Sequence, residues 1–181
     1  MDLAGLAEQL RRVTVEVIDA SQSLGSGVLW PPGCVVTNAH VVRRPWVALQ
    51  LVDGRRVQGR VIARDADADL ALLRVPGAGI PTATLADPDA ARVGAFVVAI
   101  GHPLGVRGAL TAGIIYAIGP IVPGGPAWIQ ADLRLAPGNS GGPLADATGR
   151  LVGLNARVAG PLALSVPINR VTGFARTAGV V

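Results

Sequence analysis

Glycine and proline recur between short apolar segments along the whole chain, and this spacing constrains the fold more than any other feature. The 181 residues include 24 glycines and 14 prolines. Both residue types interrupt regular helices and favour turns, so the apolar segments between them are typical of many short strands. Because the glycines follow no fixed period, a collagen-like chain is excluded.

Strands are predicted wherever apolar residues alternate or cluster between these turns. The pair Asp53-Gly54 lies between two apolar runs and is a strong signal for a hairpin. The pattern loosens over residues 76–92, which are predicted to be a linker. The predicted strands cover residues 13–18, 27–30, 34–37, 46–52, 57–63 and 70–75, and then 96–101, 109–117, 127–131, 142–145, 151–155 and 162–166.

The two ends of the chain have the pattern of short helices. One is predicted over residues 2–10, with Asp2 as its N-cap, and the other over residues 168–178. The long crossover helices that a parallel α/β sheet needs do not fit between the strands. The sequence therefore predicts an all-β fold in two halves, residues 1–88 and residues 89–181.

Composition excludes several classes of protein. The longest uncharged segment, residues 108–131, could span a bilayer by length, but the glycines and prolines within residues 119–126 exclude a membrane-spanning helix. The single Cys34 cannot form an internal disulfide, and one cysteine with two distant histidines predicts no metal site and no cofactor. The net charge is +4, but the basic residues are isolated or paired arginines, which does not favour nucleic-acid binding.

A serine surrounded by glycines is the strongest candidate for a chemical role. Ser140 lies in the segment PGNSGGPL, residues 137–144. Glycine is useful where backbone N–H groups face a bound oxygen, so Ser140 is a candidate nucleophile, with its own N–H and that of Gly138 as a candidate oxyanion hole. An ordinary glycine-rich turn is the alternative. The α/β-hydrolase elbow has the same G-x-S-x-G pattern but is excluded, because no histidine follows Ser140.

The remaining partners must come earlier in the chain, in the order His, Asp, Ser that the chymotrypsin arrangement has. His40 lies at the end of a predicted strand, and His102 lies between a strand and a turn. Asp69 immediately precedes the predicted strand 70–75, which can carry its carboxylate into the interior to accept a hydrogen bond from a histidine.

Four segments, taken in order, resemble the HtrA/DegP branch of the trypsin-like serine proteases. Two shorter matches, at residues 98–105 and 165–168, fill the space between and after them, and the resemblance covers the chain from about residue 13. The four segments are residues 25–28 (GSGV), 37–42 (TNAHVV), 69–73 (DLALL) and 138–144 (GNSGGPL).

This resemblance implies the chymotrypsin fold, with two six-stranded antiparallel β-barrels and short terminal helices. His40 and Asp69 would belong to the first barrel and Ser140 to the second. The resemblance implies that His40 is the general base, that Asp69 orients it, and that Ser140 is the nucleophile. The oxyanion hole would be formed around Gly138, Asn139 and Ser140, and His102 is assigned a structural role.

Some positions carry further expectations from the resemblance. Asn139 replaces the Asp that pairs with a new amino terminus in digestive relatives, so no zymogen cleavage is expected. Arg134, Leu164 and Ser165 are candidates for the substrate pocket. If Arg134 faced the pocket, it would favour acidic P1 side chains, but its apolar neighbours place it on the opposite face, and a small aliphatic P1 residue is expected instead. HtrA-like proteins usually continue into a PDZ module, and none is expected within these residues.

The expected function is a serine endopeptidase that cleaves unfolded or exposed polypeptide through an acyl-enzyme, in HtrA-like protein quality control. A catalytically silent protease-like binding or regulatory module is the alternative, and an esterase would share the same machinery. A homotrimer could form through the N-terminal segment, unless Leu3, Leu6 and Leu10 pack on the chain's own barrel. The lack of a signal sequence favours the cytoplasm, or the cell envelope if the chain is a piece of a longer protein.

Overall fold

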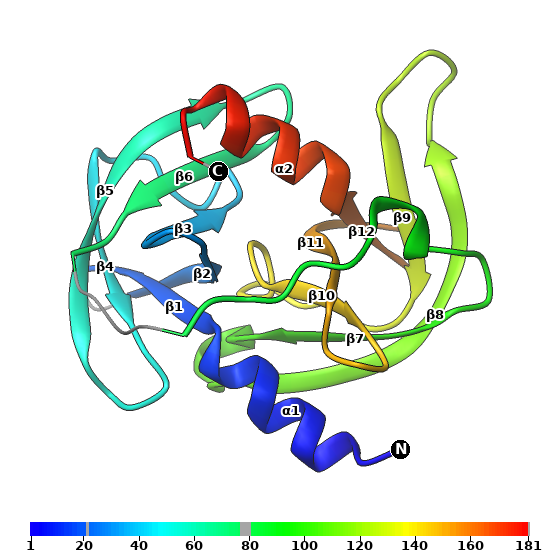
Figure 1. Cartoon of the computed structure of the whole chain (residues 1–181), viewed down its shortest axis with the longest axis horizontal. Coiled ribbons are helices and arrows are strands. Elements are labelled where there is room, and N and C mark those ends of the chain that lie inside the picture. Colours follow the sequence, from blue (N-terminus) through cyan, green and yellow to red (C-terminus); the bar gives the residue numbers. More distant parts are fainter. Residues whose placement is uncertain (21, 77–80, 181) are drawn as a thin grey trace.

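The computed structural model describes residues 1–20, 22–76 and 81–180. These residues form two closed antiparallel barrels of six strands each, which lie side by side in Figure 1 and confirm the predicted fold. Around the first barrel the strand order is β1-β2-β3-β6-β5-β4, and around the second it is β10-β11-β12-β9-β8-β7.

The strands of the first barrel are β1 (Thr14–Asp19), β2 (Gln22–Trp30), β3 (Cys34–Thr37), β4 (Trp46–Gln50), β5 (Arg56–Asp65) and β6 (Leu70–Arg74). Those of the second are β7 (Phe96–Gly101), β8 (Ala109–Pro120), β9 (Ala127–Asp132), β10 (Pro143–Asp146), β11 (Leu151–Ala159) and β12 (Leu162–Pro167). Helix α1 (Leu3–Arg12) precedes the first barrel and α2 (Ile168–Thr177) follows the second.

Most element boundaries lie within a few residues of the prediction, and the differences have a common cause. Strands β2, β8 and β11 extend further than predicted, into polar or glycine-containing segments such as residues 22–26. Pairing with a neighbouring strand holds these segments extended; for example, Gln22 pairs with Asp19. The residue pattern of one segment cannot predict such pairing, because the hydrogen bonds come from a partner strand elsewhere in the chain. Two single-turn 3₁₀ helices, η1 (Pro88–Ala90) and η2 (Pro103–Gly105), were not predicted.

The predicted linker is held against both barrels in its described part. The N–H of Ala83 donates to the Leu29 carbonyl at 2.8 Å, and the N–H of Ala86 donates to the Leu151 carbonyl at 2.9 Å. Residues 77–80 lie outside the described residues. The division of the chain between residues 88 and 89 stays a prediction.

The hairpin predicted at Asp53-Gly54 is present. It joins β4 to β5, and the Leu51 N–H donates to the Arg55 carbonyl at 2.9 Å across the turn. Gly54 has a φ of +86°, a left-handed conformation that glycine adopts without steric cost.

Strand β1 has the predicted alternation, but both of its faces are buried. Val15 and Val17 point into the core of the first barrel, and Thr14 and Glu16 on the other face are also buried. Glu16 pairs with Arg107 of the second half of the chain, at 3.2 Å between Oε2 and Nε. The polar face of β1 is therefore turned toward the second barrel rather than toward solvent.

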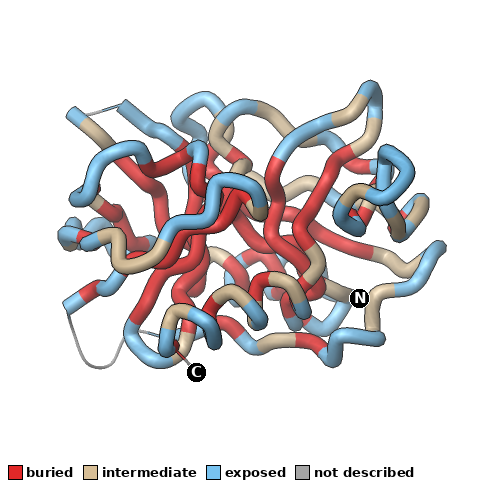
Figure 2. Tube along the Cα trace, turned by 90° about the horizontal axis from the view of Figure 1, so that it is seen from above, coloured by how far each residue is buried: buried red, intermediate tan, exposed pale blue. Residues whose placement is uncertain are grey.

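The described residues form three apolar clusters in the interior, and Figure 2 shows buried backbone continuing through the middle of the molecule. One cluster fills each barrel, and the largest lies between the barrels and includes residues of both helices. Helix α1 packs on β1 and β7, and α2 packs on β6, β11 and β12, so each helix contacts both barrels. These contacts set the position of one barrel relative to the other.

Helix α1 packs on its own chain rather than presenting all of its leucines to solvent. Asp2 caps the helix, with its Oδ1 accepting from the Gly5 N–H at 2.9 Å. Leu6 and Leu10 are buried, whereas Leu3 is 38% exposed. Neither helix among the described residues is long enough to cross a membrane, since each has ten residues.

Leu10→Ala is expected to lower the free energy of unfolding by about 2–5 kcal/mol, because it leaves a cavity between the barrels. Leu3→Ala, on the exposed side of the same helix, is the matched control and is expected to change it by about 0.5 kcal/mol or less. Urea unfolding of both variants at neutral pH measures the difference. Equal losses in the two variants would contradict this packing of α1.

Candidate active site

His40 and Asp69 lie at the same end of two neighbouring strands of the first barrel. His40 follows β3, and Asp69 immediately precedes β6, which pairs with β3. The His40 ring Nδ1 is 2.9 Å from Asp69 Oδ2 and 3.0 Å from Oδ1, and the His40 backbone N–H donates to Oδ1 at 3.1 Å. Because an ionised carboxylate only accepts hydrogen bonds, Nδ1 carries a proton, and Nε2 is the ring nitrogen that can accept a proton when the ring is neutral.

Asp69 is held in place by its backbone as well as by its carboxylate. Its φ of +54° is unusual for a residue other than glycine. The Asn38 side-chain Nδ2 donates to the Asp69 carbonyl at 3.0 Å, which secures this conformation. The Asp69 side chain is 9% exposed and the His40 side chain is 47% exposed. The pair therefore consists of a buried carboxylate and an accessible imidazole.

Arg157 of β11 reaches the same carboxylate from the second barrel. Its Nη2 is 3.9 Å from Asp69 Oδ2, and its guanidinium lies over the Trp128 ring at 4.7 Å from the ring centroid. Burial raises the pKa of Asp69, but the hydrogen bonds and charge of His40, with the charge of Arg157, outweigh burial and lower the pKa overall. Arg157 was not predicted from the sequence, because an isolated arginine two residues after Asn155 gives no signal of its own.

Ser140 lies in the turn between β9 and β10, on the second barrel. The turn is held by backbone bonds: the Gly141 N–H donates to the Asn155 carbonyl at 2.8 Å, and the Gly142 N–H donates to the Asn139 carbonyl at 3.0 Å. A Cβ on Gly141 would collide with the Ser26 carbonyl, so glycine is required there.

The Ser140 hydroxyl is not directed at His40 in this structure. Its Oγ donates to the Ala156 carbonyl at 2.9 Å. No hydrogen bond joins Ser140 to His40 among the bonds of the described residues. The structure thus brings His40 and Asp69 into contact, and leaves the Ser140 hydroxyl bonded within the second barrel.

Two backbone N–H groups around Ser140 are free to bind an oxyanion. Gly138 has a φ of +107°, and neither its N–H nor that of Ser140 donates to another backbone group within the described part of the chain. The N–H of Asn139 donates to the Ala136 carbonyl at 3.0 Å. Of the three residues predicted for the oxyanion hole, Gly138 and Ser140 can donate, and Asn139 is a buried spacer between them.

A hollow of about 370 Å³ adjoins Ser140 on the second barrel. Its walls are mostly small or aliphatic, with one cation. The lining residues are Leu135, Ala136, Pro137, Asn139, Ser140, Ala156, Arg157 and Val158.

The three residues proposed for the substrate pocket from sequence do not line this hollow. Arg134 is exposed, while Leu133 before it is buried, as their alternation indicated. Leu164 belongs to the core between the barrels. Ser165 is fully buried, and its hydroxyl donates to Asn155 Oδ1 at 3.0 Å. The arginine beside the hollow is Arg157, which lies within β11, the strand that borders the hollow.

The fold and this arrangement define the class of chymotrypsin-type serine peptidases: two six-stranded barrels, one with a His-Asp pair and the other with a glycine-flanked serine. The chain belongs to the trypsin-like peptidase family, since the sequence model of the trypsin-like peptidase domain matches residues 25–154.

Similar curated proteins are named as DegP or DegP-like serine endoproteases, and similar solved structures include an HtrA-type protease. A probable periplasmic serine endoprotease DegP-like of Ectopseudomonas mendocina is 41% identical over 76% of this chain and 30% of its own length. The periplasmic serine endoprotease DegP of Salmonella typhimurium is 39% identical over 82% of this chain and 34% of its own. A solved structure of the HtrA-type protease AlgW with a decapeptide superimposes with a TM-score of 0.90 at 26% identity, covering 98% of this chain and 67% of that one. These matches confirm the resemblance to HtrA/DegP, and the chain spans about a third of the length of these two relatives.

Asp69→Asn is expected to lower kcat by about ten-thousand-fold, because an amide in place of the carboxylate favours the wrong tautomer of the His40 ring. Asp67→Asn, an exposed change two residues earlier, is the matched control and should leave kcat unchanged. Steady-state cleavage of a fluorogenic peptide measures both. A ratio near one between the two variants would contradict the role given to Asp69.

Proposed function

We propose that this chain is a serine endopeptidase that hydrolyses peptide bonds through an acyl-enzyme, without a metal or a cofactor. The observation that carries the proposal is the hydrogen-bonded His40–Asp69 pair on one barrel, combined with Ser140 and the free N–H groups beside it on the other. Membership of the trypsin-like peptidase family supports the same function.

In the proposed mechanism, Ser140 Oγ attacks the carbonyl carbon of the scissile bond while its proton passes to His40 Nε2. The N–H groups of Gly138 and Ser140 stabilise the oxyanion of the tetrahedral intermediate. His40 then protonates the leaving amine, and the C–N bond breaks to give the acyl-enzyme. A water molecule, deprotonated by His40, hydrolyses the ester and restores Ser140. Asp69 stabilises the imidazolium in both stages.

The first step requires the Ser140 side chain to turn away from the Ala156 carbonyl and toward His40. We assign the observed hydrogen bond to a resting arrangement that substrate binding replaces. The same bond is the observation that favours the alternative, a catalytically silent binding module. An esterase would use identical steps on an ester substrate, so only a comparison of substrates separates it from a peptidase.

We propose unfolded or exposed polypeptide as the substrate, within protein quality control in the cell envelope. Two relatives are named as periplasmic endoproteases, and the AlgW structure contains a decapeptide, which supports an envelope location over the cytoplasm and a peptide ligand. Assembly through the N-terminal segment stays a prediction, and Leu3 is the leucine of α1 that remains exposed for it.

Labelling with a fluorophosphonate tests the proposed function directly. The wild-type protein is expected to form one covalent adduct on Ser140, detected by mass spectrometry, because the reagent needs an activated serine. Ser140→Ala should abolish labelling, and Ser23→Ala, at an exposed serine of β2, should leave it unchanged. A folded wild-type protein that neither labels nor cleaves peptides would support the silent module.

The lining of the hollow beside Ser140 predicts a preference for small or medium aliphatic side chains at P1, because its walls are largely apolar. A peptide library analysed by mass spectrometry measures the preference. Arg134→Ala should leave it unchanged, since Arg134 is outside the hollow. A dominant preference for Asp or Glu that disappears in Arg134→Ala would contradict this assignment.

A further inference from the structure

Ser26 connects the first barrel to the loop around Ser140. It lies on β2 and is fully buried. Its backbone N–H donates to the Ser140 carbonyl at 2.8 Å, and its hydroxyl donates to the Gly138 carbonyl at 2.7 Å. One residue of the first barrel therefore holds the carbonyls on both sides of Asn139.

The Ser26 hydroxyl oxygen has three polar atoms within hydrogen-bond distance. Which of them can donate and which can only accept decides where the hydroxyl proton points. Besides the Gly138 carbonyl, Oγ is 3.1 Å from the His102 backbone N and 3.0 Å from the His102 ring Nδ1. The Gly138 carbonyl can only accept, so it takes the hydroxyl proton, and Oγ accepts from both nitrogens of His102. This requires His102 to carry its ring proton on Nδ1.

The peptide planes on both sides of Gly138 are held from outside the loop. The Pro137 carbonyl accepts from the Leu104 N–H at 3.0 Å, so the Gly138 N–H on the opposite side of that trans peptide points away from η2. The next plane is held by its carbonyl, through Ser26 Oγ at 2.7 Å and through the His102 N–H at 3.3 Å. The N–H of that same plane, from Asn139, also donates to the Ala136 carbonyl at 3.0 Å within the loop. Gly138 has no Cβ to restrict its rotation, so these bonds together define its orientation.

We propose that Ser26 is a positioning residue for the oxyanion hole, and that His102 orients the Ser26 hydroxyl by donating from Nδ1. This inference rests on the proposed function and extends it, since it names residues that act on the reaction through Gly138 without touching the substrate. Without the hydroxyl, the Gly138 carbonyl keeps, among the bonds of the described residues, only the longer one from the His102 N–H.

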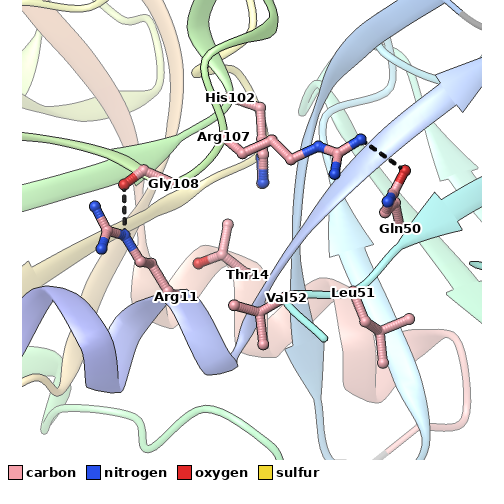
Figure 3. A pocket seen from close by; sticks show the side chains of 8 residues that line it. All are labelled: Arg11, Thr14, Gln50, Leu51, Val52, His102, Arg107 and Gly108. Atoms are coloured by element: carbon pink, nitrogen blue, oxygen red, sulfur yellow. Dashed lines mark hydrogen bonds between the residues drawn. The ribbon is translucent and has the colours of Figure 1, made fainter. Parts of the chain in front are cut away.

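The surroundings of His102 suit this role. Its ring is buried and borders a cavity of about 70 Å³ between the barrels, which Figure 3 shows together with Arg11, Gln50 and Arg107. Burial lowers the pKa of His102 to about 4; the charge of Arg107 acts in the same direction and that of Glu16 opposes it. The neutral ring has a single N–H, and the Ser26 contact places it on Nδ1.

The test compares Ser26→Ala with two variants of its partner. Ser26→Ala is expected to lower kcat by roughly 10- to 100-fold with little change in KM, because an oxyanion hole acts mainly in the transition state. His102→Leu should give a similar but smaller loss. His102→Asn should restore most of the activity, because its amide can donate to the Ser26 hydroxyl. The double variant Ser26→Ala/His102→Leu should lose no more than Ser26→Ala alone.

Stability and tautomer measurements separate positioning from simple damage to the fold. Each variant is measured at a temperature at which circular dichroism shows it to be folded. Wild-type kcat in folded Ser26→Ala, or additive losses in the double variant, would overturn the proposal.

In ¹⁵N-histidine NMR, His102 should be the Nδ1–H tautomer at neutral pH in the wild type, and an Nε2–H tautomer would also overturn the proposal. This spectrum needs no activity, so it tests the contact even if fluorophosphonate labelling of the wild type fails and the proposed function is wrong.

Discussion

The packing of two barrels through one shared apolar core is the constraint on which the rest of the structure depends. His40 and Asp69 belong to one barrel, and Ser140 belongs to the other. Their relative position is therefore a property of the interface rather than of either barrel. Both helices contact both barrels, and the largest apolar cluster lies between them. A small change at this interface would separate the three groups without altering the local structure around any of them.

Polar contacts across the interface then set the details of the site. Ser26 reaches from the first barrel to the carbonyls beside Ser140, and Arg157 reaches from the second barrel toward Asp69. Ser26 and Asp69 are buried, so their polar groups need partners, which makes this part of the arrangement specific. The unusual φ of Asp69 is likewise held by a hydrogen bond, from the Asn38 side chain, because backbone strain persists only where surrounding bonds hold it.

Much of the fold could be predicted from local patterns, and the errors occurred where distant segments meet. Strand β1 was predicted from its alternation, but its polar face is covered by the second barrel, with Glu16 paired to Arg107. The extra length of β2 and β11 comes from pairing with neighbouring strands. Leu164 and Ser165 were expected at the substrate pocket; both are buried, and neither lines the hollow beside Ser140. A side chain's direction near a barrel interface depends on the partner barrel, which no short segment contains.

The sequence by itself determined the fold class, the candidate His40, Asp69 and Ser140, and the need for glycine around the serine. It could do so because period-two alternation, turn residues and short motifs are local features of the chain. Only the tertiary structure decided which groups touch: the Asp69 carboxylate with His40, the Ser140 hydroxyl with the Ala156 carbonyl, and Ser26 with Gly138. The physical reason is that hydrogen bonds depend on distances of about 3 Å between atoms far apart in sequence, and packing of the complete chain sets those distances.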